Sequence, residues 1–154
     1  MPRAEIFDLR SIVERKQQLA ASLEADWFMH ADLDEIRLPP KDLPTLAAAF
    51  ADADCNGFNA VNFLESTFVP TVEHPEHEHA NFRQTMRWYY PFLPFFPHRL
   101  TAWKRPAVPV ELTGPGGQRV GFPGARIAPQ PIRMRHYRFL GDPPGSAQDE
   151  PRPT

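Results

Sequence analysis

Trp27-Phe28-Met29-His30-Ala31-Asp32-Leu33-Asp34-Glu35 runs from apolar residues straight into three carboxylates. An aromatic and aliphatic run of this kind predicts a buried strand that ends in acidic residues. Because side chains alternate across a strand, Asp32 and Asp34 should share one face, with Cα atoms roughly 6.6 Å apart. Two carboxylates so close need a cation between them, and Mg²⁺ or Mn²⁺ prefers such oxygen ligands. We therefore expect a divalent metal site here, the alternative being an ordinary solvated loop.

The flanking sequence predicts helices on both sides of this strand. Apolar residues recur at helical spacing over 8–25, where Asp8 can cap the first turn, and again over 42–54, where Asp42 can do so. Residues 37–40, Arg-Leu-Pro-Pro, predict a turn, and residues 58–64 predict a second strand. A helix between two strands indicates a βαβ crossover, so the two strands should run parallel in one sheet.

This order of elements and residues resembles the middle of a family 2 glycosyltransferase of the GT-A fold. The resemblance consists of a helix with Lys16, a hydrophobic strand, the Asp32-Leu33-Asp34-Glu35 motif and Arg135-His136-Tyr137 near the C-terminus. In such enzymes the Asp-x-Asp motif holds the Mn²⁺ or Mg²⁺ ion that binds the diphosphate of a nucleotide-sugar donor. The resemblance implies a partial GT-A-like α/β domain over 1–140, with a mixed, Rossmann-like sheet, flanking helices and a loop-rich second half. It also implies that the family's N-terminal nucleotide-binding half does not precede Asp32 in this chain.

The resemblance extends to individual residues. It implies that Lys16 approaches the nucleotide or its phosphates, and that His136 adds a metal contact to Asp32 and Asp34. Glu65, just past the predicted second strand, is the candidate general base for the acceptor hydroxyl, with Glu35 and Asp54 as weaker candidates. Each residue also has a simpler interpretation, because Lys16 and Glu65 can be solvated charges and His136 can be a core histidine that faces inward with Ile132 and Met134. A non-catalytic metal- or sugar-binding remnant of such an enzyme is the alternative function.

The composition limits the possible partners. The formal net charge is −2 and the pI about 6.3, which does not suggest nucleic acid as a partner. A single cysteine, Cys55, excludes an internal disulfide, and no apolar run is long enough to span a bilayer. The N-terminus lacks the apolar core of a signal peptide, so we expect a cytoplasmic protein. The partners that the family resemblance implies are a nucleotide-sugar donor and an unidentified acceptor.

The second half of the chain is rich in proline and aromatic residues. Residues 73–79 alternate glutamate and histidine, which indicates a loop more than a structural zinc site. The aromatic-rich segment 81–97 could line an acceptor groove, cap the core or form a face that packs on a missing part of the protein. Short strands are expected near 100–104, 109–112 and 131–139, with a glycine-rich hairpin turn at 113–117. Residues 141–154 have the composition of a disordered tail.

Overall fold

The computed structural model describes residues 8–71, 81–93, 96–112 and 117–140 of the 154-residue chain. Three helices and six strands are found in these segments. The elements in chain order are α1 (Leu9–Ser22), β1 (Trp27–Met29), β2 (Glu35–Leu38), α2 (Leu46–Cys55), β3 (Ala60–Val69), α3 (Phe82–Thr85), β4 (Trp88–Phe92), β5 (Arg99–Lys104) and β6 (Ile132–His136). The tail predicted over 141–154 and the histidine-rich segment 73–79 lie outside the described residues.

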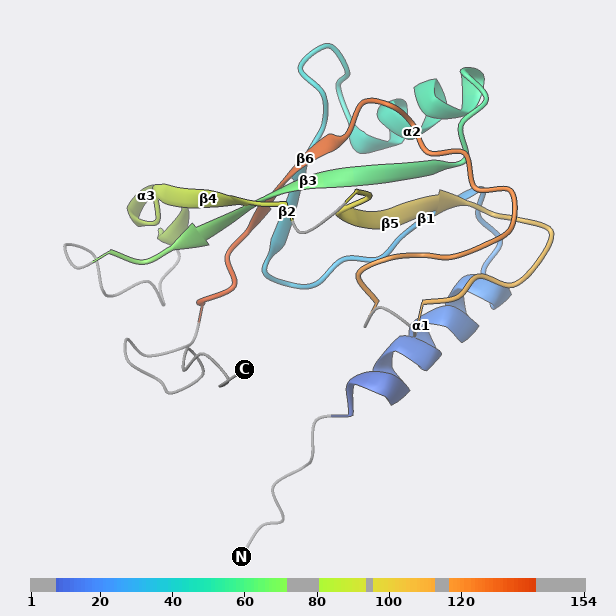
Figure 1. Ribbon diagram of the computed structural model, residues 1–154, viewed down its shortest axis with the longest axis horizontal. Coiled ribbons are helices and arrows are strands. Elements are labelled where there is room, and N and C mark those ends of the chain that lie inside the picture. The colour runs from blue at the N-terminus through green and yellow to red at the C-terminus, as the bar shows by residue number, and fades with distance from the viewer. Residues whose placement is uncertain (1–7, 72–80, 94–95, 113–116, 141–154) are drawn as a thin grey trace, which may run out of the picture.

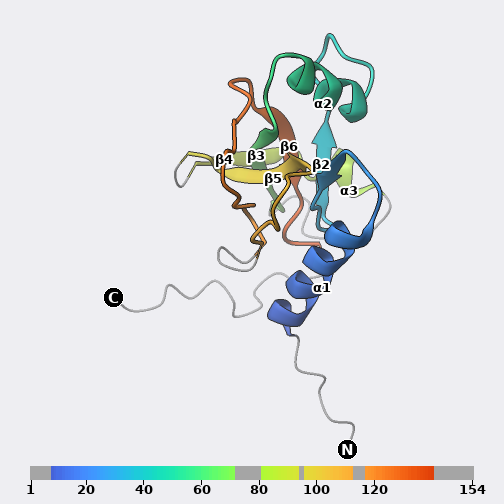
Figure 2. The same ribbon diagram turned by 90° about the vertical axis from the view of Figure 1, so that its right-hand side faces the viewer.

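The strands form one mixed sheet, in which strands from the first and second halves of the chain alternate. The order is β1-β5-β3-β6-β2, and β4 pairs with the distal part of β3. β6 runs parallel to β3, whereas β5 runs antiparallel to both β1 and β3. β1 and β3 therefore run in the same direction, as predicted, with β5 between them. The predicted βαβ crossover is wrong, because β2, the strand directly before α2, runs antiparallel to β3. Helices α1 and α2 flank opposite faces of this sheet, which confirms the α/β class (Figures 1 and 2).

Both long helices begin at a side-chain cap. Asp8 accepts a hydrogen bond from the Ser11 backbone N–H, as the sequence predicts. Helix α2 begins later than expected, because Thr45 accepts from the Ala48 N–H and serves as the cap in place of Asp42. The helix ends at Asn56, and Gly57 follows with φ +81°, a conformation that glycine adopts without strain.

Strand β2 corrects the prediction of a turn at Arg37 and Leu38. Residues 35–38 pair in antiparallel register with β6, and Arg37 lies opposite Met134. The two prolines that follow cannot donate to a ladder, but a residue before proline favours the extended conformation, which suits a strand that ends there. The chain therefore turns back within residues 30–34, between β1 and β2.

The core divides into two main clusters on the two faces of the sheet. On the α2 face, Ala49, Phe50 and Ala53 of the helix pack against Phe63 and Met134. On the α1 face, Val13 packs among residues that include Ala60, Leu100 and Trp103. A third cluster joins Phe68, Met86 and Tyr137 beside α3.

A buried arginine on β2, at one end of the strand order, bonds to β5 and to the residue that follows β1 at the other end. The Arg37 guanidinium on β2 donates to the backbone oxygen of His30 at 2.7 Å and to Thr101 Oγ1 on β5 at 3.2 Å. It also lies over the Phe63 ring, 4.8 Å from the centroid, and pairs with Glu35 at 2.8 Å. The α2 face of the sheet therefore carries ionic side chains beside its apolar core.

We expect Phe63→Ala to lower the free energy of unfolding by about 3 to 5 kcal/mol, because it leaves a cavity beneath α2 and removes the ring under Arg37. Leu33→Ala is the matched control, since Leu33 is fully exposed and its loss should change stability by less than about 0.5 kcal/mol. Urea unfolding followed by circular dichroism measures both. Equal losses in the two variants would contradict this assignment of the core.

Candidate functional site

The candidate site lies where the parallel strands β1 and β6 end. Asp32 and Asp34 occupy the turn between β1 and β2 rather than a continuation of the strand, because β1 ends at Met29. The expectation that both carboxylates share one strand face is therefore wrong. The Tyr137 backbone N–H donates to the Asp34 carbonyl oxygen at 2.9 Å, which fixes the turn to the end of β6.

A chain of three side chains joins this turn to the centre of the sheet. His136 Nε2 lies 3.2 Å from Asp34 Oδ2, and its Nδ1 lies 2.6 Å from Glu65 Oε1. The side chain of His136 points inward with Ile132 and Met134, as the alternation of residues predicts. Residues that are far apart in sequence thus meet in one acid–imidazole–acid arrangement.

Glu65 occupies a position that the sequence did not predict. It lies in the middle of β3 rather than past the end of the strand, because β3 continues to Val69. Only 2% of the residue is exposed. Its carboxylate accepts hydrogen bonds from the Arg99 guanidinium and from Thr67 Oγ1, the latter at 2.9 Å. The carboxylate is therefore occupied by Arg99, Thr67 and His136, and its predicted role as a general base stays a prediction.

The charges of Asp34, His136 and Glu65 stabilise one another. Burial by itself disfavours charge, but the hydrogen bonds to Asp34 and Glu65 raise the pKa of His136 to about 9. Burial likewise opposes ionisation of Glu65, yet His136 and Arg99 lower its pKa to about 2. The hydrogen bond from His136 also lowers the pKa of Asp34. At neutral pH the site is an imidazolium held between two carboxylates.

Asp32 belongs to a second, adjacent cluster with Lys16 and His30. Lys16 Nζ donates to Asp32 Oδ1 at 3.2 Å and lies 2.9 Å from His30 Nε2, which is itself 3.3 Å from the same carboxylate oxygen. The hydrogen bond with His30, together with Lys16, lowers the pKa of Asp32 well below its usual range despite partial burial. Lys16 also borders a hollow of about 240 Å³ whose walls include Phe28 and Trp103.

The backbone of Gly117 lies close to the His30 ring. It has φ +81°, and a Cβ atom placed on it would lie 2.5 Å from His30 Cε1 and 3.3 Å from Val13 Cγ2. The sequence marks this glycine as part of a hairpin turn, and the antiparallel bridge between Glu111 and Gly121 agrees with a hairpin. The contact with His30 is a second reason for glycine at this position, since a Cβ atom there would displace the His30 ring.

The three predicted metal ligands are not gathered into one cluster. Asp34 and His136 touch, whereas the Asp32 carboxylate turns toward Lys16 and His30. Within the parts of the chain that the structure describes, no three His, Cys, Asp or Glu side chains are placed to hold a metal ion together. As placed here, Asp34 and His136 are the two predicted ligands that a single ion could reach together.

The weaker base candidates are both held in ion pairs. Glu35 pairs with Arg37 and accepts from the Asp32 backbone N–H at 3.1 Å. Asp54, in the last turn of α2, pairs with Lys104 at 2.7 Å. His30 and Arg99 are the site residues that sequence reasoning left out, although the arginine that opens the strand Arg99-Leu-Thr-Ala-Trp-Lys is a detectable signal, since a charge in a buried strand needs a partner.

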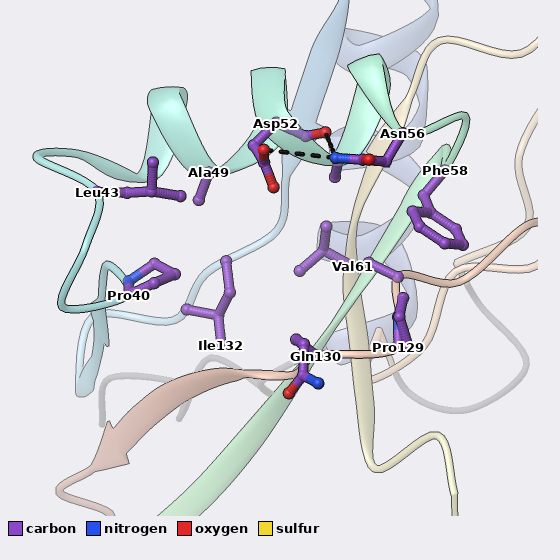
Figure 3. A pocket seen from close by; sticks show the side chains of 12 residues that line it. Pro40, Leu43, Ala49, Asp52, Asn56, Phe58, Val61, Pro129, Gln130 and Ile132 are labelled. Atoms are coloured by element: carbon purple, nitrogen blue, oxygen red, sulfur yellow. Dashed lines mark hydrogen bonds between the residues drawn. The ribbon is translucent and has the colours of Figure 1, made fainter.

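A separate cavity lies between α2 and the sheet (Figure 3). Its volume is about 290 Å³, and Val61 and Ile132 are among the apolar residues that line it. At its upper wall the Asn56 side-chain amide donates to the Asp52 backbone oxygen at 2.8 Å. None of the predicted site residues lines this cavity, so it is distinct from the acid–imidazole site.

The pKa shifts predict a stability optimum in mildly acidic solution. The pKa of His136 is raised from 6.5 to about 9, so its contribution is complete below pH 6.5 and is lost as the pH rises through 9. The pKa of Glu65 is lowered from 4.5 to about 2, so its contribution is complete above pH 4.5 and is lost as the pH falls through 2. The contribution of the pair is therefore largest between pH 4.5 and 6.5.

Urea unfolding at several pH values measures this dependence. We expect the free energy of unfolding to fall by on the order of 2 to 3 kcal/mol between pH 6.5 and about pH 10, and His136→Gln to flatten that fall. His98→Gln, which removes a histidine outside this chain of contacts, should keep it. An unchanged alkaline loss in His136→Gln would show that the imidazolium does not stabilise the fold.

Gly117→Ala should destabilise the chain more than Gly57→Ala. Both glycines have φ +81°, so both variants carry a backbone strain of about 1 kcal/mol, but only the Cβ at position 117 meets another residue, while nothing lies within 4 Å at position 57. We expect the His30 ring resonances to shift in Gly117→Ala alone, as measured by proton–carbon NMR. Equal stability and unshifted His30 signals would mean that the loop gives way without moving His30.

Comparison with known proteins gives no relative for this chain. No protein-family model, curated protein or solved structure matches it. Among the described residues, no helix is both long and apolar enough to cross a membrane. The chemistry of the site must therefore be judged from its own geometry.

Proposed function

We propose that this chain carries the donor-diphosphate end of a metal-dependent glycosyltransferase that resembles family 2 enzymes of the GT-A fold. In this proposal a nucleotide-sugar binds beside the turn between β1 and β2, and its sugar is transferred to an acceptor hydroxyl. The finer fold assignment is part of the same proposal and is supported by the parallel course of β1, β3 and β6. In open α/β sheets, ligands bind at the carboxyl ends of such strands.

The observation that carries the proposal is the contact between Asp34 and His136. One residue comes from the Asp-x-Asp turn and the other from the last strand, and their side chains approach to 3.2 Å. The second ring nitrogen of His136 is held by the buried Glu65. Metal-binding histidines characteristically pair their second ring nitrogen with a carboxylate in this way, which fixes the ring and raises its basicity.

The donor set fits a divalent cation. Asp34 and His136 would hold the ion, and Asp32 would join them if its carboxylate left Lys16. A bound Mn²⁺ or Mg²⁺ supplies Lewis-acid neutralisation of the leaving diphosphate. Without the ion, the positive charge beside Asp34 is that of the His136 imidazolium, since a proton and a metal compete for the same nitrogen.

Lys16 fits a role in phosphate binding. Its ammonium group lies beside the same turn as Asp34, and it borders the hollow of about 240 Å³ that Phe28 and Trp103 help to line. A lysine that releases Asp32 to a metal would become available to a phosphate oxygen. The side chain is about one-third exposed, so a ligand can reach it.

The surroundings of Glu65 favour a second candidate function, a non-catalytic metal- or sugar-binding module. Transfer of a sugar to a hydroxyl requires a base within hydrogen-bond reach of that hydroxyl. Glu65 is buried beneath Arg99, Thr67 and His136, and in the proposed metal site it positions His136 instead. The two candidates share the metal site and differ in whether sugar transfer occurs.

Calorimetric titration of Mn²⁺ into the full chain, with and without UDP, tests the proposal. We expect binding in the wild type, tighter binding with UDP, and a loss of at least about tenfold in affinity in Asp34→Ala and in His136→Gln, because each variant removes a ligand. Asp42→Ala is the control, since it removes an exposed carboxylate from the loop before α2 and should leave the affinity unchanged.

Two outcomes separate the candidates and one rejects both. Metal and UDP binding with turnover of a nucleotide-sugar supports the transferase, whereas binding without turnover supports the non-catalytic module. A folded chain that binds no Mn²⁺, or that binds it equally well after Asp34→Ala and His136→Gln, contradicts the metal site. Circular dichroism of each variant establishes that it is folded.

A further inference from the structure

Strand β4 exposes aromatic side chains to solvent, whereas most residues of β3, with which it pairs, are buried. Trp88, Tyr89 and Tyr90 are 68%, 58% and 43% exposed. Of the remaining residues of the strand, Pro91 is also exposed and Phe92 is half-buried. Contiguous exposed apolar patches on a protein surface often mark a binding site.

The register of β4 shows which rings share a face with the candidate site. Trp88, Tyr90 and Phe92 lie opposite Val69, Thr67 and Glu65 of β3. Residues directly opposite in an antiparallel pair project to the same side of the sheet. Tyr89 projects to the other side, where its ring lies 5.1 Å from that of Phe68. We call the row Trp88, Tyr90 and Phe92 the ring face of β4.

The ring face lies beside the acid–imidazole site, because Tyr90 and His136 both lie opposite Thr67, on the two sides of β3. The Arg99 guanidinium lies 5.3 Å from the centroid of the Phe92 ring and donates to Glu65, which contacts His136. Trp88 and Phe92 are four residue steps apart along the strand, a distance of about 13 Å. A ligand of a few rings could therefore lie along β4 and extend from Tyr90 across β3 toward His136.

The strand is better suited to a flat ligand than to a partner strand. Among the residues that the structure describes, β4 pairs with β3 alone. A chain that added to its other edge would need a regular row of backbone donors and acceptors, and Pro91 removes one donor from this strand. The rings themselves present flat apolar faces, and the phenol of Tyr90 adds a hydrogen-bonding group. A pyranose has the matching combination, an apolar ring face surrounded by hydroxyl groups.

We propose that the ring face of β4 binds a saccharide, whose pyranose rings stack on Trp88 and Tyr90. This proposal rests on the proposed function and deepens it, because the saccharide is the acceptor whose terminal hydroxyl lies at the site of Asp34 and His136. Tyr90, which is level with His136 across β3, is the stacking residue that lies toward the metal site.

Titration of the full chain with maltotetraose, cellotetraose and chitotetraose, without metal or nucleotide, tests the saccharide site. Tryptophan fluorescence is a useful readout, because Trp88 is 68% exposed, while Trp103 is only 3% exposed and Trp27 is half-buried and stacked on Phe50. We expect at least one tetrasaccharide to protect Trp88 from acrylamide quenching. Calorimetry should give an affinity about tenfold weaker for Trp88→Ala and for Tyr90→Ala, because each loses one stacked ring.

Tyr89→Ala is the matched control, since it removes an equally exposed ring from the same strand but from the opposite face, and its affinity should stay within about twofold of the wild type. Trp88→Phe keeps a ring and should retain most of the binding. The proposal would be overturned if none of the three sugars bound, or if Tyr89→Ala lost as much saccharide affinity as Trp88→Ala. Self-association that depends on Trp88 in sedimentation experiments would also overturn it, because it would identify a second copy as the occupant.

The titration also separates this proposal from the metal site. Trp88→Ala should keep the Mn²⁺ affinity of the wild type while it loses saccharide affinity. If the manganese titration fails and the sugars still bind in a Trp88- and Tyr90-dependent manner, the transferase is rejected and the saccharide site is supported. If manganese binds and no sugar does, the acceptor surface is rejected and the metal site is supported.

Discussion

The buried carboxylate of Glu65 is the constraint on which the site depends. An uncompensated charge at this depth would cost many kcal/mol, so the fold must supply hydrogen-bonding partners from neighbouring elements. Arg99 comes from β5, His136 from β6 and Thr67 from β3 itself. Through His136 the same requirement extends to Asp34 and fixes the turn between β1 and β2. One charge in the middle of β3 therefore links three strands and one turn.

The turn between β1 and β2 divides its two aspartates between two clusters. Asp32 faces Lys16 of α1 and His30, whereas Asp34 faces His136. The division lets each carboxylate find a positive partner without a bound cation. In the proposed site, a metal ion that also recruited Asp32 would draw it away from Lys16 and leave the lysine available to an anionic ligand. Cation binding would then be coupled to anion binding through one short turn.

The α2 face of the sheet changes character along its length. Beneath α2 it is apolar, and Phe63, Ile132 and Met134 form its floor. Farther along β3 it becomes ionic at Glu65 and Arg99, and along β4 it ends in exposed aromatic rings. Apolar packing holds the sheet at one end, so the other end is free to present polar and aromatic groups to a ligand. This gradient is why the proposed metal and saccharide sites lie at the end away from α2.

The sequence alone determined the α/β class, both long helices, the parallel course of β1 and β3 and the inward direction of His136, because periodicity and capping are local properties. It placed Glu65 at a strand end, Asp32 with Asp34 on one face, and a turn at Arg37 and Leu38; all three differ in the structure. Only tertiary contacts decided these points, since the length of β3 depends on pairing with β4, β5 and β6, and the direction of each aspartate depends on residues distant in sequence. Local spacing can show that a charge needs a partner, but only the folded sheet determines which partner comes within reach.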